Sequence, residues 1–180
     1  LVPKVKHTAR ILYIIYLGLS LIEFIILLLA KMPVFDAMNT TFGTAGTGGF
    51  GIKNSSLGGY SVTIQWIVTV FMILFGVNFN AYYLMLFGSI KKDLTMEEVR
   101  AYFGIILTSI VIITINIYSM CSSVWDAITK SAFQVGSIIT TTGFSTIDFN
   151  LWPQTSKTIL VLLMFVGACA GSTGGGIKAV

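Results

Sequence analysis

Long apolar segments alternate with short, polar, glycine-rich links along the chain. Apolar runs cover residues 11–30, 62–88 and 101–120, and a shorter run over 158–170 ends at a glycine cluster. Because a helix rises about 1.5 Å per residue, each of the first three runs can cross the roughly 30 Å hydrocarbon core of a bilayer. The pattern predicts three spanning helices and a fourth, over 154–180, that is short or broken.

The two links that follow the first and third apolar runs are similar to each other. One reads VFDAMNTTFGTAGTGGFGI from Val34, and the other reads VWDAITKSAFQVGSIITTTGFSTI from Val124. Each begins with valine, an aromatic residue and Asp-Ala, each contains Thr-Xaa-Gly-Phe, and Gly143 follows Gly49 by 94 positions. The flanking apolar runs superimpose at the same offset. The sequence therefore predicts a duplicated membrane module.

The predicted fold is an all-α polytopic membrane protein built from potassium-channel-like modules. In each link, the segment from the Asp of Asp-Ala to the central glycine is too short to span a bilayer. Its length suits a half-helix that enters the membrane from outside and stops midway. Its last carbonyls, the negative end of the helix dipole, then face a cation. The first module covers 1–90, with span 11–30, pore helix and filter loop 34–52 and span 62–88; the second covers 91–180, with span 101–120, pore helix and filter loop 124–146 and broken span 154–180.

Composition and charge agree with a membrane protein. Hydrophobic residues make up 55% of the chain and charged residues 10%, against about 25% charged residues in soluble domains. The net charge of +4 does not indicate nucleic acid, because the basic residues are scattered. Basic residues are modestly more frequent in the links on one side of the membrane than on the other. By the positive-inside rule, this predicts a cytoplasmic amino terminus and filter loops facing outside. The basic residues then lie inside at Lys4, Lys6, Arg10, Lys91, Lys92, Arg100 and Lys178, and outside at Lys31, Lys53, Lys130 and Lys157.

The strings TGGFG at 47–51 and TTGFS at 141–145 predict cation-binding loops. Irregular backbone is tolerated at membrane depth only where it is buried in protein or lines a water-filled cavity. Rings of carbonyl oxygens replace the hydration shell of K⁺, and glycine lets successive carbonyls point the same way. Both strings share threonine, central glycine and a following aromatic residue with the channel filter TVGYG. A glycine-rich hairpin explains either string alone, but two copies between spans favour a filter.

Three ordered motifs give the chain a family resemblance: TAGTGGF at 44–50, TTTGFSTIDFNLWP at 140–153 and GACAGSTGGGIK at 167–178. Through them the chain resembles the Trk/Ktr/HKT superfamily of potassium uptake proteins, most closely the TrkH-type subunit, over essentially its whole length. Members of the superfamily carry four membrane–pore-loop–membrane modules around one pore. The resemblance implies that this chain is a piece holding the second and third modules.

Carried over by position, the resemblance implies a potassium filter made mostly of main-chain oxygens. Ser145 departs from the last glycine of the channel filter, and we expect weaker upper ion sites as a result. In the plant branch, serine at the central glycine accompanies sodium transport, so glycine at both central positions favours potassium. The implied filter residues are Thr47, Gly48, Gly49, Phe50, Thr141, Thr142, Gly143 and Phe144, with K⁺ at Thr47, Gly48, Thr141 and Thr142.

The third glycine cluster, GSTGGGIKA at 171–179, differs from a phosphate-binding loop because Ile177 separates the last glycine from the lysine. A break in a transmembrane helix explains it better, since glycines hold a helix poorly and the two hydroxyl residues satisfy freed backbone groups. The resemblance implies an intramembrane gate below the filter, and a passive kink is the alternative. The implied gate residues are Gly171, Ser172, Thr173, Gly174, Gly175 and Gly176.

Isolated polar residues have open interpretations. Glu23 lies in the middle of a span, where an ionisable group is a functional candidate. Three interpretations stay open: a structural pair with Lys178 or with a residue of the missing modules, a role in the ion path, and a protonated side chain without a function. Asp36 and Asp126 suit the positive ends of the pore helices. Asp148 either concentrates cations at the pore mouth or caps a turn. Hydrogen bonds between helices are expected for Asn78, Asn80 and Asn116.

The leading functional hypothesis is inward K⁺ transport through the filter and past the gate, with K⁺ as the transported ion and no bound cofactor. No arrangement of nucleophile, base or metal ligands indicates an enzyme. The alternatives are a non-conducting membrane scaffold or assembly subunit, and a sodium/potassium channel of the same architecture. The resemblance further implies a plasma membrane or bacterial inner membrane location, two remaining pore modules, a homodimer and a cytoplasmic nucleotide-binding regulatory subunit.

Overall fold

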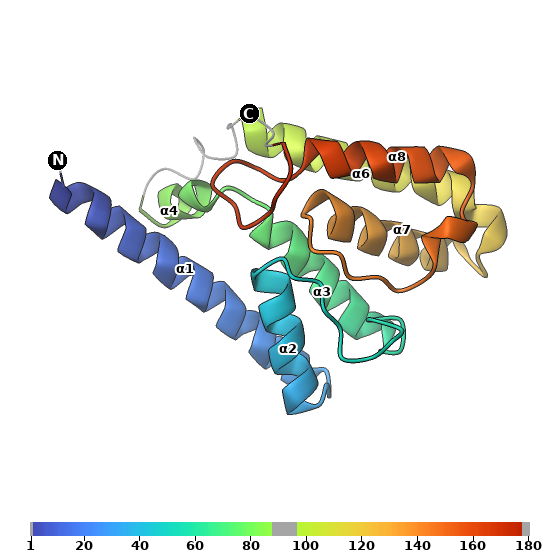
Figure 1. The fold of residues 1–180 in the computed structure, drawn as a ribbon, viewed down its shortest axis with the longest axis horizontal. Coiled ribbons are helices and arrows are strands. Elements are labelled where there is room, and N and C mark those ends of the chain that lie inside the picture. Colours follow the sequence, from blue (N-terminus) through green and yellow to red (C-terminus); the bar gives the residue numbers. More distant parts are fainter. Residues whose placement is uncertain (1, 88–96, 178–180) are drawn as a thin grey trace.

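The computed structural model describes residues 2–87 and 97–177 as a set of packed helices (Figure 1). Lys91, Lys92 and Lys178, the boundary between the predicted modules and the end of the predicted broken span lie outside these residues. The helices are α1 (Val2–Leu29), α2 (Val34–Ala45), α3 (Val62–Phe75), α4 (Phe79–Phe87), α6 (Glu97–Ile117), η1 (Tyr118–Met120), α7 (Val124–Ile139), η2 (Phe149–Leu151) and α8 (Gln154–Val166).

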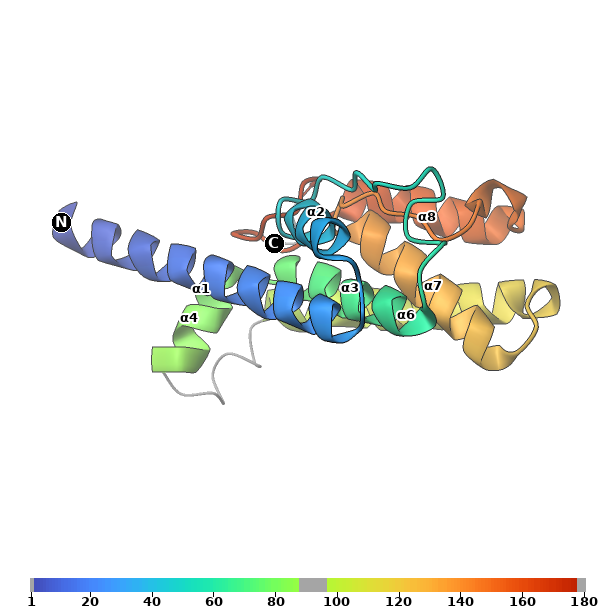
Figure 2. The same cartoon turned by 90° about the horizontal axis from the view of Figure 1, so that it is seen from below.

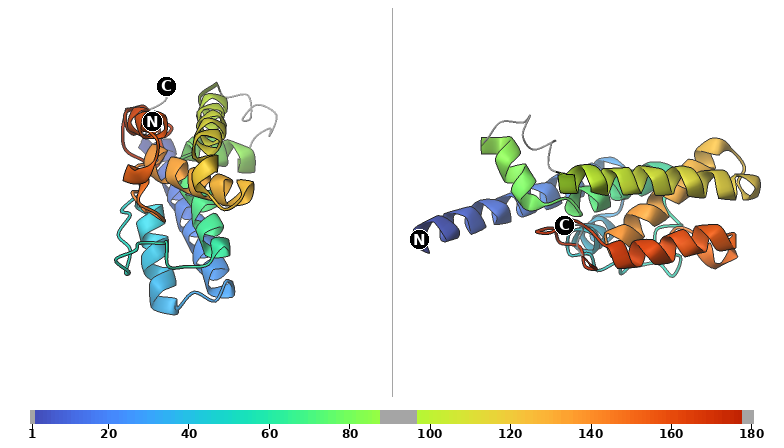
Figure 3. Two further views of the ribbon diagram at one scale, coloured as in Figure 1. Left: turned by 90° about the vertical axis from the view of Figure 1, so that its right-hand side faces the viewer. Right: turned by 90° about the horizontal axis from the view of Figure 1, so that it is seen from above.

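The helices form two neighbouring groups, with α1, α2 and α3 in one and α6, α7 and α8 in the other. In each group a short helix, α2 or α7, contacts the helices that precede and follow it. The groups meet where α3 packs against α7 (Figures 1 and 2). Further views show α8 and α6 on either side of α7 (Figure 3).

Within the described residues, two helices are long and apolar enough to cross a membrane, over His7–Leu29 and Glu97–Met120. Both expose large apolar side chains: Leu29 is 77% exposed and Ile115 74% exposed. Contiguous apolar surface of this kind is unfavourable in water and suits a lipid or protein environment. These features are those of an integral membrane protein.

The apolar run 62–88, predicted from the sequence as one span, does not form one straight helix. The chain instead forms α3 and α4, whose axes are bent by 87° at the short break between them. Gly76 ends α3, and the Asn78 side chain starts α4 by accepting a hydrogen bond from the Asn80 N–H at 2.9 Å. A helix can break here because both new helix ends find hydrogen-bond partners.

Aromatic side chains of the second group are buried against the first group. Phe133 and Phe144 are at most 1% exposed and pack with Leu27, Val68 and Met72. This apolar contact fixes the end of α7 and its following loop beside α2 and α3. It therefore positions the two glycine-rich loops relative to each other.

Candidate ion pathway and gate loop

Helices α2 and α7 end in the same hydrogen-bonded turn. At the end of α2, the Thr47 N–H donates to Thr44 O (3.2 Å) and the Gly48 N–H to Gly43 O (2.8 Å). This pair of bonds defines a Schellman motif, which closes a helix and redirects the chain. The α7 bonds lie 94 positions further on, from Thr141 N to Ile138 O (3.0 Å) and from Thr142 N to Ser137 O (2.9 Å).

Both turns place threonine where glycine is usually found. Thr47 has φ 51° and Thr141 has φ 57°, and two residues later Gly49 and Gly143 also have positive φ. A β-branched residue in this left-handed region costs about 1–3 kcal/mol and persists only where the surroundings hold it. The contacts of these threonines with their surroundings must therefore hold this conformation.

The two hydroxyl groups bind the glycine-rich loop that follows α8. Thr47 Oγ1 donates to Thr173 O at 3.3 Å, and the Gly175 N–H donates to Thr141 Oγ1 at 2.6 Å. A Cβ on Gly174 would lie 3.1 Å from Thr140 O, so this loop is in contact with the end of α7. The predicted gate loop thus touches the first residue of both predicted filter loops.

The predicted filter loops also touch each other. A Cβ on Gly49 would overlap Thr142 O, which shows how closely the two backbones approach. The Thr142 hydroxyl is buried and shares a 2.8 Å hydrogen bond with the Thr140 hydroxyl, so this side chain points away from the loop surface. A Cβ on Gly143 would meet no atom within 4 Å. The second loop therefore offers main-chain atoms, and no side chain, at its central glycine.

The two aromatic filter candidates have different surroundings. Phe144 is 1% exposed and its ring lies on Gly43, whereas the corresponding Phe50 is 86% exposed. Ser137 Oγ donates to Phe144 O at 2.5 Å. The Phe144 ring and carbonyl are thus both held, one by α2 and the other by α7.

The bend between α3 and α4 lies beside the gate loop, which turns back toward it after α8 (Figure 1). A helix end leaves its last carbonyls without helical partners. Here each of them accepts a hydrogen bond from a neighbouring element. The bonds run from Tyr102 Oη to Ile73 O (3.1 Å), from Tyr82 Oη to Leu74 O (2.7 Å), from Thr173 Oγ1 to Phe75 O (3.2 Å) and from Cys169 N to Gly76 O (3.1 Å).

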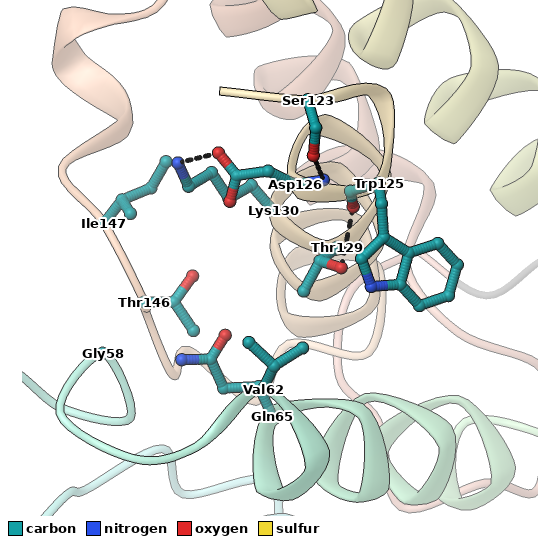
Figure 4. Close-up of a pocket in the computed structure, with 10 residues that line it drawn as sticks. All are labelled: Gly58, Val62, Gln65, Ser123, Trp125, Asp126, Thr129, Lys130, Thr146 and Ile147. Carbon is teal, nitrogen blue, oxygen red and sulfur yellow. Dashed lines mark hydrogen bonds and ion pairs between the residues drawn. The ribbon is translucent and has the colours of Figure 1, made fainter. Parts of the chain in front are cut away.

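A pocket of about 310 Å³ lies between the starts of α3 and α7 and the chain after the second filter loop (Figure 4). Asp126 accepts a 2.7 Å hydrogen bond from Lys130 there, which lowers the pKa of the Asp126 carboxyl. Ser123, not Asp126, caps α7 by accepting from the Asp126 N–H at 3.2 Å. None of the filter candidates lines this pocket.

The other acidic candidates of the link regions make local bonds. Asp36 accepts a 2.6 Å hydrogen bond from the Tyr60 hydroxyl. Burial, and then the bond to Asp36 and its negative charge, raise the pKa of Tyr60 to about 12. Asp148 accepts from the Asn150 N–H at 3.0 Å and so caps the turn η2. Asp36 ties the long loop to α2, and Asp148 is engaged locally.

Glu23 is fully buried, and neither carboxyl oxygen has a hydrogen-bond partner within acceptable geometry among the described residues. The Thr44 hydroxyl lies beside it but donates to Thr40 O at 2.7 Å. Lys178, the partner considered from the sequence, lies outside the described residues. Glu23 thus lies beside Thr44, near the end of α2.

Comparison with known proteins identifies the family. The TrkH family of cation transport proteins matches residues 1–180. This chain belongs to the TrkH family. Family members are transport proteins, and the helical, apolar architecture agrees with membership.

Named relatives cover the chain almost completely. It is 35% identical to the Trk system potassium uptake protein TrkH of Salmonella typhimurium, over 99% of this chain and 38% of the relative. It is 31% identical to TrkI of Halomonas elongata, over 98% of this chain and 36% of the relative. The crystal structure of the potassium transporter TrkH from Vibrio parahaemolyticus superimposes with a TM-score of 0.91 at 33% identity, over 98% of this chain and 39% of that one. The chain thus spans less than two fifths of these relatives.

Sequence reasoning missed two residues of α6 that bind the bend beside the gate loop. Tyr102 and Glu98 lie one turn apart on α6, and both reach the bend between α3 and α4. Asn78, expected to bond between helices, does so with Glu98 at 3.2 Å. A polar Gly-Val-Asn-Phe-Asn string within the apolar run 62–88 was the available signal for the bend.

Proposed function

We propose that this TrkH-family chain contributes two filter loops and one intramembrane gate to a K⁺ uptake pathway. The filter uses main-chain oxygens of Thr47, Gly48, Thr141 and Thr142, together with the residues that follow them. The gate is the loop over 171–176, directly below the filter. In this proposal the amino terminus is cytoplasmic, the filter faces outside, and the membrane is the bacterial inner membrane.

One observation carries the proposal: two loops with the same turn, the same positive-φ pattern and mutual contact both bind a third loop through their first threonines. Glycine at Gly49 and Gly143 allows the backbone to turn carbonyls toward a common axis. Thr47 and Thr141 are held at unfavourable positive φ by their turns, and both of their hydroxyls bind the gate loop. This arrangement suits an ion that leaves the filter and meets a closed loop.

The filter is tested by ion uptake into a strain deficient in K⁺ uptake that expresses the full-length protein. The ions measured are K⁺, radioactive rubidium and Na⁺. Gly143→Ser is preferred because a Cβ at Gly143 would meet no atom within 4 Å, so its cost is limited to the φ of 93°, whereas a side chain at Gly49 would also overlap Thr142 O. Gly104→Ser on α6, also without a neighbour within 4 Å, is the control. We expect a lower preference for K⁺ over Na⁺ in Gly143→Ser only. An unchanged preference contradicts the filter.

Deleting residues 174–176 tests the gate. Because Gly174 and Gly175 contact Thr140 and Thr141 at the end of α7, we expect the deletion to raise basal flux. Unchanged flux in a correctly inserted protein contradicts the gate and favours a passive kink. If neither set of variants alters flux or selectivity, the scaffold alternative is the better account.

The wider assembly is also part of the proposal. The other two pore modules, a second copy of the protein and a cytoplasmic nucleotide-binding subunit follow from the family resemblance. Purification of the tagged full-length protein, with its mass measured in detergent and its co-purifying proteins identified, tests the last two. A monomer without a nucleotide-binding companion contradicts them.

A further inference from the structure

We propose that Glu98 is a positioning residue that holds the gate loop in place against the bend between α3 and α4. This inference rests on the proposed function of the loop. Glu98 belongs to the first turn of α6 and accepts two hydrogen bonds from two different elements. One of its oxygens binds Ala170, the residue directly before the gate loop 171–176, and the other binds the bend.

The geometry of the two bonds is complementary. Glu98 Oε1 accepts from the Ala170 N–H of the loop, and Glu98 Oε2 accepts from Asn78 Nδ2 at 3.2 Å. Asn78 is 7% exposed, and its other side-chain atom, Oδ1, accepts from the Asn80 N–H. The carboxylate and the amide thus form one chain of hydrogen bonds from the loop to the start of α4. Bonds to a charged group are about twice as strong as neutral ones.

The loop also lies directly against the bend. A Cβ on Gly171 would lie 2.9 Å from Asn78 Oδ1, and Gly171 O accepts from the Phe79 N–H at 3.1 Å. The other bonds between loop and bend start from backbone atoms or from Thr173. In this proposal the Glu98 side chain, which belongs to a third helix, holds the start of the loop against the bend.

Glu97 provides a matched control on the same helix. It precedes Glu98, lies in the same first turn and is exposed. Both glutamates interact equally well with the positive end of the α6 dipole. A charge or dipole effect predicts equal results for Glu97→Gln and Glu98→Gln, whereas a positioning role predicts an effect for Glu98→Gln alone.

Reciprocal substitution of the pair gives a sharper test. Glu98 accepts from two donors, so Glu98→Gln turns an N–H group toward either Ala170 or Asn78. Asn78→Asp instead places two carboxylates against each other. In the double variant the new amide donates to the new carboxylate and still accepts from Ala170, so the hydrogen-bond chain is restored with the donor reversed.

Rubidium uptake by the full-length protein measures the effect. Loss of one charge-assisted bond corresponds to roughly a tenfold shift in the balance between a held and a released loop. We expect each single variant to raise basal flux by about that factor, and the double variant and Glu97→Gln to stay within about twofold of the wild type. Glu98→Gln behaving like Glu97→Gln, or a double variant that does not recover, overturns the proposal.

A second readout separates this proposal from the proposed function. The rate of maleimide labelling of Ser172→Cys, in a background without other cysteines, reports loop release whether or not the loop gates K⁺. Faster labelling with Glu98→Gln, but unchanged flux, supports the positioning role and contradicts the gate. Altered selectivity with Gly143→Ser, but unchanged labelling and flux with Glu98→Gln, supports the filter and overturns the role of Glu98.

Discussion

Replacing Gly43 by alanine tests how tightly the two helix groups meet at the proposed filter. A Cβ on Gly43 would lie 2.8 Å from Phe144 Cζ, and the ring must move by about 0.6 Å to reach the 3.4 Å of ordinary contact. Phe144 is 1% exposed, so it has little space into which to move. Overpacking of this kind costs about 1–3 kcal/mol.

Gly18→Ala separates this cost from the intrinsic preference of alanine for helices. Gly18 lies in α1, and its Cβ would meet no atom within 4 Å. Both variants gain about 1 kcal/mol from helix propensity, so the difference between them isolates the clash. We expect Gly43→Ala to be less stable than Gly18→Ala by about 1–3 kcal/mol, and we also expect its preference for K⁺ over Na⁺ to fall.

The assay heats the full-length protein in detergent and measures the midpoint of thermal denaturation by size-exclusion chromatography. All variants are compared at the same heating rate. Phe144→Leu removes the ring atom that clashes and keeps the main-chain carbonyl. Combined with Gly43→Ala, it is expected to recover about 1–2 kcal/mol relative to the sum of the single effects. Equal midpoints for Gly43→Ala and Gly18→Ala, or strict additivity in the double variant, refute the reasoning.

Three further predictions concern residues around the filter. Thr141→Gly relieves the positive-φ strain but removes the bond to Gly175. The two effects oppose each other, so the stability of the protein should stay within about 1 kcal/mol of the wild type, while rubidium flux rises. Thr141→Ser keeps the hydroxyl, and its rubidium flux should match that of the wild type. Glu23→Gln should preserve the yield of monodisperse protein, and Glu23→Lys should abolish it, because the site is fully buried and lacks a charged partner among the described residues. Asp36→Asn should lower the pKa of Tyr60 from about 12. A pH titration of tyrosinate absorbance measures this pKa, and the signal of Tyr60 is the part that disappears when Tyr60→Phe is added. Because folding raises this pKa, the Tyr60 contribution to stability is full below about pH 10 and is lost as the pH rises through the folded-state value.

The helices and the loops between them follow from local patterns. Runs of apolar residues over 11–30 and 101–120 specify the two long helices, and the glycine strings mark the places where helices end. Thr47 and Thr141 stand at equivalent positions in the two strings, so a shared role could be inferred from the sequence. What their hydroxyls bind could not, because Thr47 and its partner Thr173 are 126 positions apart.

The bend between α3 and α4 shows why apolar length alone is insufficient. The run 62–88 carries no charge, and by hydropathy it is one span. Its helix ends at Gly76 because Tyr102, Thr173 and Cys169 supply donors to the freed carbonyls, and these residues belong to α6 and to the gate loop. Only the folded arrangement provides those donors, so the string Gly76 to Asn80 marks a weak point of the helix but does not by itself determine that the chain bends there.

The bend and the gate loop are therefore one structural feature. An unpaired peptide group at membrane depth costs several kcal/mol, and each of the two irregular segments supplies partners to the other. Phe75 O and Gly76 O accept from Thr173 and Cys169 of the loop, and Gly171 O accepts from the Phe79 N–H of α4. Moving the loop away without α4 leaves these groups unpaired. If this loop gates K⁺ as we propose, opening must either carry α4 with the loop or admit water to the same carbonyls, and a hydrated ion pathway would provide that water.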